Sequence, residues 1–301
     1  MKQHAKASVM AAFVADALAL GPHWIYNPEQ IQALFGRVES LQKPHPETFH
    51  KNREKGEFTH YGDQMQVLLE SVAEKDAFDL LDFSDCWRKL FTDYDGYMDT
   101  ATRNTLANYK AGKSPETAGS TSDDLAGASR VAPLVYRYRN DPESLVQSAI
   151  LQTRMTHTDD ATVESAAYFA RVTQAVLGGT APVTAMTSVA EEYFDISPVS
   201  AWLQKGLATI EKDSVAVINE FGASCHTGEM FPGVVHLIAR YENDLTEALV
   251  QCVMAGGDSA ARGSLVGMVL GAHLGMESIP TEWLTEMKAA KTIDALLARI
   301  S

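Results

Sequence analysis

Six aspartates lie directly before, or at the first residues of, segments whose apolar residues have helical spacing. Free N–H groups and the helix dipole favour an anion at a helix N-terminus, so such an aspartate either caps its helix or presents its carboxylate to a ligand. Taken alone, any one of them is explained as an N-cap, which stabilises a helix by about 1 kcal/mol. The aspartates are Asp63, Asp123, Asp124, Asp159, Asp160 and Asp258.

The same acids have a second interpretation when they are taken together. If several acid-bearing helix N-termini converge on one pocket, they form an oxygen-ligand site of the kind that suits Mg²⁺. Asp16 adds to the set because it lies among alanines, on a small-residue face that we expect to pack against another helix. A carboxylate buried there needs a hydrogen-bonding partner or a metal ion. The residue pattern leaves capping and ligand binding open.

Histidines and aromatic residues stand beside several of these acids. His157 lies in MTHTDD, His23 and Trp24 lie in LGPHWIY, and His60 and Tyr61 precede an aspartate. A histidine near carboxylates can orient a ligand, and an aromatic ring beside a polar group can stack on a base or a sugar face. Each of these residues also suits a purely structural role, as a satisfied histidine or a core ring.

The elements that must position these residues are helices, because helical spacing of apolar residues dominates the chain. No segment alternates apolar and polar residues as a half-buried strand does, so we predict an all-α fold. With no linker, low-complexity block or internal repeat, we expect one domain over residues 1–301, with residues 40–62 as the longest irregular stretch. The expected helices are residues 2–20, 63–74, two within 82–112, one from 123 onward, 142–154, 159–177, 197–211, 230–241, 244–255, 259–275 and 281–298.

Four glycines recur at every fourth position of the apolar segment 259–275, at Gly263, Gly267, Gly271 and Gly275. On a helix they line one ridge, where the missing side chains allow another helix to approach closely. Each glycine inside a helix costs about 0.5–1 kcal/mol relative to alanine, so we expect close packing to offset that cost.

The composition excludes some classes of partner. Lysine and arginine total 25 and aspartate and glutamate total 39, which gives a net charge of −14 and argues against a nucleic-acid or anionic-membrane surface. The three cysteines, Cys86, Cys225 and Cys252, form neither a disulfide framework nor a zinc pattern and favour a reducing, cytoplasmic location. No apolar run reaches the roughly 18 residues of a membrane span.

Five motifs, in order along most of the chain, resemble those of the ADP-ribosylglycohydrolase superfamily, which includes dinitrogenase-reductase-activating glycohydrolases and J1 crystallins. ADALALGPHWIY resembles the first-helix Gly-Asp-x-x-Gly motif, and THYGDQMQVLLES lies where the family has Thr-Asp-Asp-Thr-Gln-Met. SDDLAGASRVAPL, with Arg130 and Pro133, is similar to Gly-x-x-Met-Arg-x-x-Pro, and RMTHTDD is similar to a histidine-containing helix start. The most specific is GGDSAARGSLVGMVLGAHLG, which resembles Gly-Gly-Asp-Thr-Asp-Thr and its glycine-rich helix.

This resemblance implies a compact, orthogonal multi-helix bundle that hydrolyses the bond between ADP-ribose, or a related nucleotide sugar, and an ADP-ribosylated protein or small molecule. Active members hold two Mg²⁺ ions between the Thr-Asp-Asp and Asp-x-Asp-Thr motifs. The metals and carboxylates would orient the ribose diol and activate water for attack at an oxocarbenium-like carbon.

The chain departs from the family at its metal motifs. Ala260 and Ala261 replace the second Asp and Thr of the last motif, and methyl groups cannot coordinate Mg²⁺. In the second motif only Asp63 is an acid, and His23 falls where the first motif has its acid. An intact two-metal site is therefore not expected, and Asp63 and Asp258 are the candidate ligands for any Mg²⁺ that binds.

The resemblance, carried over residue by residue, assigns catalytic roles to Asp63, Asp258 and His157. Ligand-binding roles are assigned to residues of the same motifs and their flanks, which are Asp16, His23, Trp24, His60, Tyr61, Asp123, Asp124, Gly256, Gly257 and Ser259. Three functions stay open: a divergent hydrolase, a catalytically inactive binder of ADP-ribose or another nucleotide sugar, and a crystallin-like structural protein. The sequence does not identify the aglycone or the oligomeric state.

Overall fold

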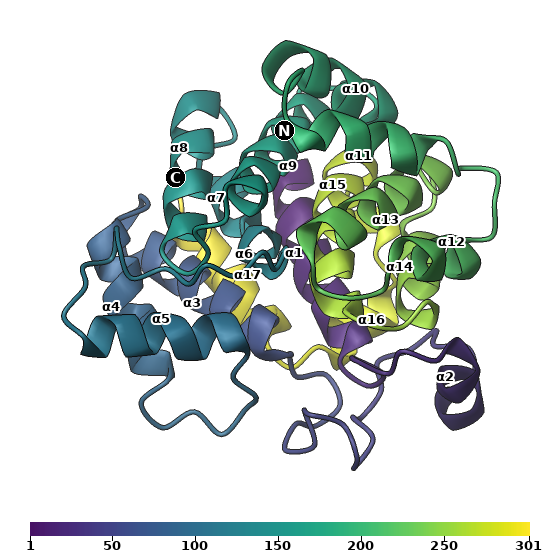
Figure 1. Cartoon of the computed structure of the whole chain (residues 1–301), viewed down its shortest axis with the longest axis horizontal. Helices are drawn as coiled ribbons and strands as arrows, with labels where there is room; N and C mark the ends of the chain where they lie inside the picture. The colour runs from purple at the N-terminus through teal and green to yellow at the C-terminus, as the bar shows by residue number, and fades with distance from the viewer.

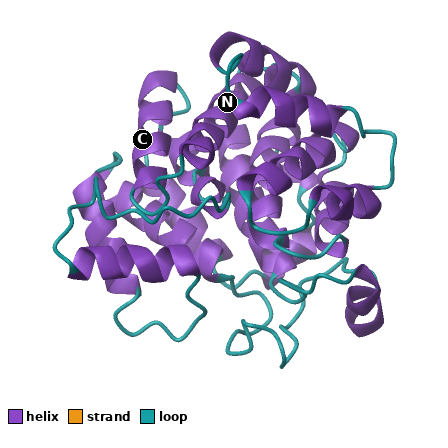
Figure 2. Cartoon of the chain, in the orientation of Figure 1, coloured by secondary structure: helices purple, strands orange, loops and turns teal.

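Two long helices pack against each other at the centre of the molecule, and the other helices surround them (Figure 1). The computed structural model describes residues 1–301 and contains helices, turns and loops but no strand (Figure 2). The central helices are α1 (Lys2–Ala19) and α15 (Ser259–Leu274), in which nearly every residue is buried. The predicted all-α fold is confirmed.

The remaining helices are mostly short and are joined by turns that hold glycine, proline and aspartate. None of the helices is long and apolar enough to cross a membrane. In chain order they are α2 (Pro28–Phe35), α3 (His60–Lys75), α4 (Leu80–Leu90), α5 (Thr100–Lys110), α6 (Ala126–Ser129), α7 (Ala132–Arg137), α8 (Pro142–Arg154), α9 (Asp160–Leu177), α10 (Pro182–Tyr193), α11 (Pro198–Leu207), α12 (Ser214–Phe221), α13 (Thr227–Arg240), α14 (Leu245–Met254), the 3₁₀ turn η1 (Met276–Ser278), α16 (Thr281–Glu286) and α17 (Ala290–Arg299).

The glycine ridge of α15 is the surface on which α1 rests, as its four-residue spacing predicts. A Cβ atom at Gly267 would lie 2.5 Å from the carbonyl oxygen of Ala11, and one at Gly271 would lie 2.7 Å from that of Ala7. Side chains at these positions would therefore collide with the backbone of α1. Gly275 is not part of the ridge, because it ends α15 with a φ of +83°, a conformation that favours glycine.

Two expected elements differ from the structure. The segment NPEQ, expected to be a connection, begins α2, because Asn27 accepts hydrogen bonds from the N–H groups of Glu29 and Gln30 and Pro28 occupies the first helical turn. The single helix expected from Asp123 onward is two short helices, α6 and α7, with Pro133 in the first turn of the second.

Helices α10 and α12 were not expected, and the segment 281–298 is α16 and α17 rather than one helix. The irregular stretch expected at residues 40–62 extends from Gly36 to Thr59 and ends where α3 begins at His60. This long loop covers one end of α1 and contributes side chains to the site described below.

Two extended segments bring distant parts of the chain together without forming a sheet. Asp124 and His226 form an isolated antiparallel bridge, in which the N–H of Leu125 donates to the carbonyl of Cys225 at 3.0 Å. The N–H of Thr227 donates to the carbonyl of Asp123 at 2.8 Å. These backbone bonds fix the Asp123–Asp124 pair beside the start of α13.

Candidate functional site

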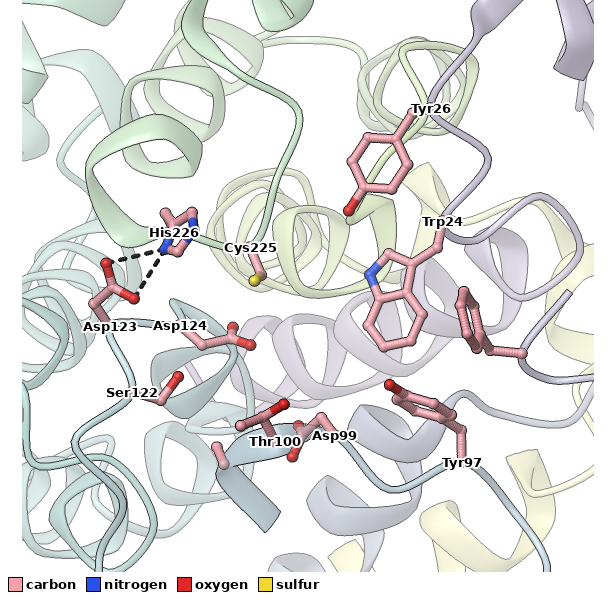
Figure 3. A pocket seen from close by; sticks show the side chains of 12 residues that line it. Trp24, Tyr26, Tyr97, Asp99, Thr100, Ser122, Asp123, Asp124, Cys225 and His226 are labelled. Atoms are coloured by element: carbon pink, nitrogen blue, oxygen red, sulfur yellow. Dashed lines mark hydrogen bonds and ion pairs between the residues drawn. The ribbon is translucent and has the colours of Figure 1, made fainter. Parts of the chain in front are cut away.

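A cavity of about 500 Å³ opens between the start of α5, the bridge described above and the turn that follows α1 (Figure 3). One part of its lining is aromatic and the other is acidic, which suits a ligand with a ring face and polar groups. No lysine or arginine is among the lining residues. These are Trp24, Tyr26, Phe49, Tyr97, Asp99, Thr100, Ala101, Ser122, Asp123, Asp124, Cys225 and His226.

The aromatic wall consists of Trp24, Tyr26, Phe49 and Tyr97. Trp24 makes edge-to-face contacts with Tyr97 and Phe49, with ring centroids 4.9 and 5.3 Å apart. Its backbone has a φ of +64°, an uncommon conformation for a bulky residue. A backbone hydrogen bond of 3.0 Å from the N–H of Trp24 to the carbonyl of Gly257 holds it there. The indole is thus positioned by the glycine turn before α15.

The acidic wall begins with Asp123 and Asp124. Both carboxylate oxygens of Asp123 lie within 3.0 Å of Nδ1 of His226, an exposed pair (Figure 3). The Asp124 side chain is buried except at the cavity and accepts a hydrogen bond from the N–H of Ala126. The Asp123 carboxylate is therefore exposed to solvent and paired with His226, whereas the Asp124 carboxylate is largely removed from solvent.

Asp258 lies behind Asp124 and has no exposed surface. One of its oxygens accepts a hydrogen bond from the N–H of Ala261, and the other accepts the hydroxyl of Tyr61 at 2.9 Å. Oxygens of Asp124 and Asp258 and the Cys225 sulfur all lie within 4.8 Å of one another. Burial raises the pKa of Asp258, and burial together with the charges of Asp258 and Asp99 raises the pKa of Asp124 well above its usual range.

Asp99 has the opposite electrostatic environment on the same cavity. It caps α5 through the N–H of Thr102, and its second oxygen lies 3.3 Å from Nε2 of His60. Burial alone would raise the pKa of Asp99, but the contact with His60 outweighs it and holds that pKa below its usual range. The cavity therefore holds one carboxyl group that favours its proton and one that favours its charge.

Asp16 does not line the cavity. Its carboxylate accepts hydrogen bonds from the N–H and hydroxyl of Thr59, at 2.8 and 2.6 Å, and from the N–H of Gly62 at 3.2 Å. Burial outweighs these bonds and raises the pKa of Asp16 to about 7. The predicted burial near another helix is confirmed, and the buried carboxylate joins α1 to the start of α3.

Asp63 and His157 also lie away from the cavity lining. Asp63 accepts hydrogen bonds from Arg53 at 2.7 Å and from the hydroxyl of Tyr94 at 2.6 Å. His157 is buried against Gly127, with Nδ1 2.9 Å from the Thr156 hydroxyl, and burial lowers its pKa to about 4. The two residues have local partners, and their catalytic assignments stay predictions.

His23, His60 and Tyr61 form a layer directly behind the aromatic wall. The His23 ring stacks on Trp24 with centroids 4.6 Å apart, and the His60 ring lies 5.4 Å from that of Tyr97. These three residues are buried; His60 also lies beside Asp99, whereas Tyr61 and His23 lie beside Asp258.

The glycine turn before α15 packs closely against the segments that carry Trp24 and Cys225. Gly256 and Gly257 have positive φ, and a Cβ atom on them would lie 2.4 Å from the carbonyl oxygen of Ile25 and 1.9 Å from that of Ala223. Ser259 is buried and its hydroxyl has no hydrogen-bonding partner. Of the residues predicted to bind ligand, Trp24, Asp123 and Asp124 line the cavity directly.

Sequence reasoning missed several lining residues. Asp99 could have been predicted, because it directly precedes a helical segment, as the candidate aspartates named above do. Tyr26, Phe49 and Tyr97 lie in loops and turns, where no spacing marks them, and Cys225 and His226 reach the cavity only through the bridge to Asp124.

The donor set does not fit two Mg²⁺ ions. Asp124 and Asp258 are the two carboxylates that lie together, the third member of the cluster is a soft thiol, and Ala260 and Ala261 add no oxygen. Asp63 is held by Arg53 rather than by this cluster. The residues of this cluster therefore do not form a two-Mg²⁺ centre.

Comparison with known proteins gives consistent matches over the whole chain. The sequence model described as ADP-ribosylglycohydrolase matches residues 1–301. Crystallin J1A of Tripedalia cystophora is 24% identical, covering 97% of this chain and 94% of the crystallin. ADP-ribosylhydrolase ARH3 of Bos taurus is 28% identical over 112 residues, which cover 33% of this chain and 31% of the bovine protein.

A solved structure titled "ADP-ribosylglycohydrolase-related protein complex" has the same fold. It superimposes with a TM-score of 0.77 and covers 99% of this chain and 97% of its own, at 21% identity. At this identity the likeness shows a shared fold.

Proposed function

The chain belongs to the ADP-ribosylglycohydrolase family, and we propose that it hydrolyses the glycosidic bond of an ADP-ribosyl or related nucleotide-sugar substrate in the cavity between Trp24 and Asp124. The observation that carries this proposal is the pair of carboxyl groups with opposite pKa shifts on one cavity, Asp124 and Asp99. Such pairs are the usual arrangement for acid–base hydrolysis of glycosides.

In this proposal Asp124 is the general acid. Burial and its two acidic neighbours raise its pKa and favour its protonated form, so it can protonate the departing nitrogen or oxygen of the aglycone as the bond to the anomeric carbon breaks. Water then bonds to that carbon and returns a proton to Asp124. Asp258, which has no exposed surface, is a positioning residue that acts through Asp124.

Asp99 is the charged partner. An ionised carboxylate on the cavity stabilises the positive charge that develops on the sugar ring in an oxocarbenium-like transition state. The Asp99 carboxylate is fixed by the N–H of Thr102 and by His60, so it requires little reorganisation when that charge appears.

The aromatic wall suits the face of a base or sugar, because ring stacking needs no charged contact. The diphosphate of the substrate would lie at the open rim, since the lining has three carboxylates and no lysine or arginine. In this proposal the sugar and its aglycone lie beside Asp124.

The test is release of free ADP-ribose from ADP-ribosylated peptides, followed by chromatography. The Asp124→Asn variant should lose about 10²–10⁴-fold in rate, the usual worth of general acid–base catalysis. The Asp123→Asn variant makes the same substitution at the adjacent, exposed residue and should lose less than about tenfold. Equal losses in the two variants would contradict the assignment of Asp124.

A crystallin-like or purely binding role is the second candidate, favoured by the similarity to crystallin J1A and by Ala260 and Ala261 in the last motif. Binding of ADP-ribose without turnover would support a binder. Neither binding nor turnover would support a structural protein on this scaffold.

A further inference from the structure

Three buried histidines converge behind the aromatic wall from three separate parts of the chain. His23 lies in the turn after α1, His50 lies in the long loop 36–59, and His60 is the first residue of α3. Their exposed fractions are 0%, 2% and 0%. One ring nitrogen from each lies within 4.8 Å of the others. None of the three belongs to the acidic cluster of Asp124, Cys225 and Asp258.

The cluster leaves its ring nitrogens without enough partners. Both nitrogens of His23 and Nδ1 of His50 are buried with no hydrogen-bonding partner. A buried polar atom without a partner is destabilising, and native proteins keep few of them. His23 is the member of the cluster with no partner at either ring nitrogen, and a metal ion bound between the three rings would satisfy one of them.

We propose that His23, His50 and His60 form a binding site for one divalent transition-metal ion, with Zn²⁺ as the best fit. In a tetrahedral zinc site with Zn–N bonds of 2.0–2.1 Å, ligand nitrogens lie about 3.3 Å apart. Nε2 of His50 and Nδ1 of His60 are 3.2 Å apart. The remaining separations, at most 4.8 Å, need to close by no more than about 1.5 Å.

Asp99 completes the arrangement from outside. Its carboxylate lies 3.3 Å from Nε2 of His60, the nitrogen that points away from His50. A carboxylate beside one nitrogen of an imidazole is a common outer-shell arrangement when the other nitrogen binds a metal. The Asp258 side chain, 4.0 Å from Nε2 of His23, is a second acidic group beside the cluster.

The three nitrogen ligands favour some metal ions over others. Three neutral imidazoles suit Zn²⁺ and its transition-metal neighbours, whereas Mg²⁺ requires oxygen ligands and retains its water. Three protein ligands also leave a fourth position for a water molecule. The site therefore differs in metal and in ligands from the acidic cluster at Asp124 and Asp258.

A metal here would join the long loop to the helices that carry the pocket. His50 would be tied to His23, whose ring stacks on Trp24, and to His60, whose ring contacts Tyr97. The ion would thus hold the aromatic wall and the loop 36–59 in place. This role stands whether or not the cavity hydrolyses a glycoside.

The experiment titrates metal-free protein with Zn²⁺ by calorimetry, and with Co²⁺ by visible absorption, which reports a low-symmetry nitrogen site. We expect one site per chain, no comparable binding of Mg²⁺, and a rise in Tm and in protease resistance of the loop 36–59 when Zn²⁺ is added. The Asp99→Asn variant should lower Zn²⁺ affinity by about 10–100-fold, as loss of an outer-shell carboxylate does.

The His50→Ala variant should lose Zn²⁺ affinity by more than 100-fold, roughly the upper limit for an outer-shell loss. His236→Gln is the matched control, because it removes an equally buried histidine whose nitrogens already contact Thr209 and Ser214, and it should bind Zn²⁺ as the native chain does. If His50→Ala fails to fold, the Zn²⁺-induced rise in Tm of the native chain still tests the proposal. Absence of Zn²⁺ binding by the native chain, or loss of it in Cys225→Ser instead of His50→Ala, would overturn it.

Discussion

Replacing Gly267 with alanine tests how the two central helices fit together. The added Cβ would lie 2.5 Å from the carbonyl oxygen of Ala11 and 2.8 Å from its carbonyl carbon, both backbone atoms of α1. A backbone cannot move aside as a flexible side chain can, so α1 and α15 must separate locally. Because α15 begins beside Asp258 and the glycine turn that holds Trp24, a shift of this helix would also disturb the cavity.

The magnitude follows from two opposing terms. Alanine improves intrinsic helix propensity by about 0.5–1 kcal/mol relative to glycine. Overpacking of a tight core typically costs about 1–3 kcal/mol. The added Cβ would lie below 3 Å from backbone atoms of α1, so we expect the cost of overpacking to exceed the gain in helix propensity. The free energy of unfolding should fall by about 1–2 kcal/mol.

Gly263→Ala is the control on the same helix. Its Cβ would meet its nearest atom, the Cβ of Ala15, at 3.4 Å, which is an ordinary contact. We therefore expect Gly263→Ala to be neutral or to stabilise by up to about 1 kcal/mol. Urea or thermal unfolding of both variants measures the difference. If Gly267→Ala is as stable as Gly263→Ala, the inferred closeness of α1 and α15 is wrong.

Three further changes test other parts of the structure. Thr59→Ala removes the cap of α3 and a hydrogen bond to the buried Asp16 carboxylate, so we expect a loss of about 2–4 kcal/mol by urea unfolding, whereas Thr59→Ser should cost under about 1 kcal/mol. Burial lowers the pKa of His236 from 6.5 to about 4, so its contribution to stability is complete above pH 6.5 and is lost as the pH falls toward 4. The unfolding free energy of His236→Asn should therefore vary with pH less steeply in that window, by up to about 1.4 kcal/mol per pH unit, and equal slopes would refute the shift. Tyr97→Ala removes one ring of the aromatic wall and should weaken ADP-ribose binding by about 5–150-fold in calorimetry, the worth of one stacking contact; unchanged affinity would place the base elsewhere.

The helical core was predictable because its signals are local. Apolar spacing marked α1, α8, α9 and α15 nearly to their ends, and the four-residue glycine spacing indicated the close contact with α1. Boundaries failed where a local signal was overlooked, as with the Asn27 cap and Pro28 at the start of α2.

The site was predictable only in part. Asp124 and Trp24 were selected for their positions beside helix starts and turns, and both line the cavity. Which acids meet depends on contacts across the chain, such as the pairing of Asp63 with Arg53, and no spacing in the sequence encodes them. His50 lies in a loop without periodicity, so its meeting with His23 and His60 was visible only in three dimensions.

The central claim is that the cavity binds a nucleotide sugar through its own side chains. Calorimetric titration of the native chain with ADP-ribose, in EDTA and again with excess Mg²⁺, tests it most directly. We expect saturable binding of one ADP-ribose per chain in both conditions, with affinities within about tenfold of each other, because the acidic cluster lacks the oxygen ligands of a two-metal site. A strict requirement for Mg²⁺ would contradict that argument, and no binding in either condition would contradict the proposed function itself.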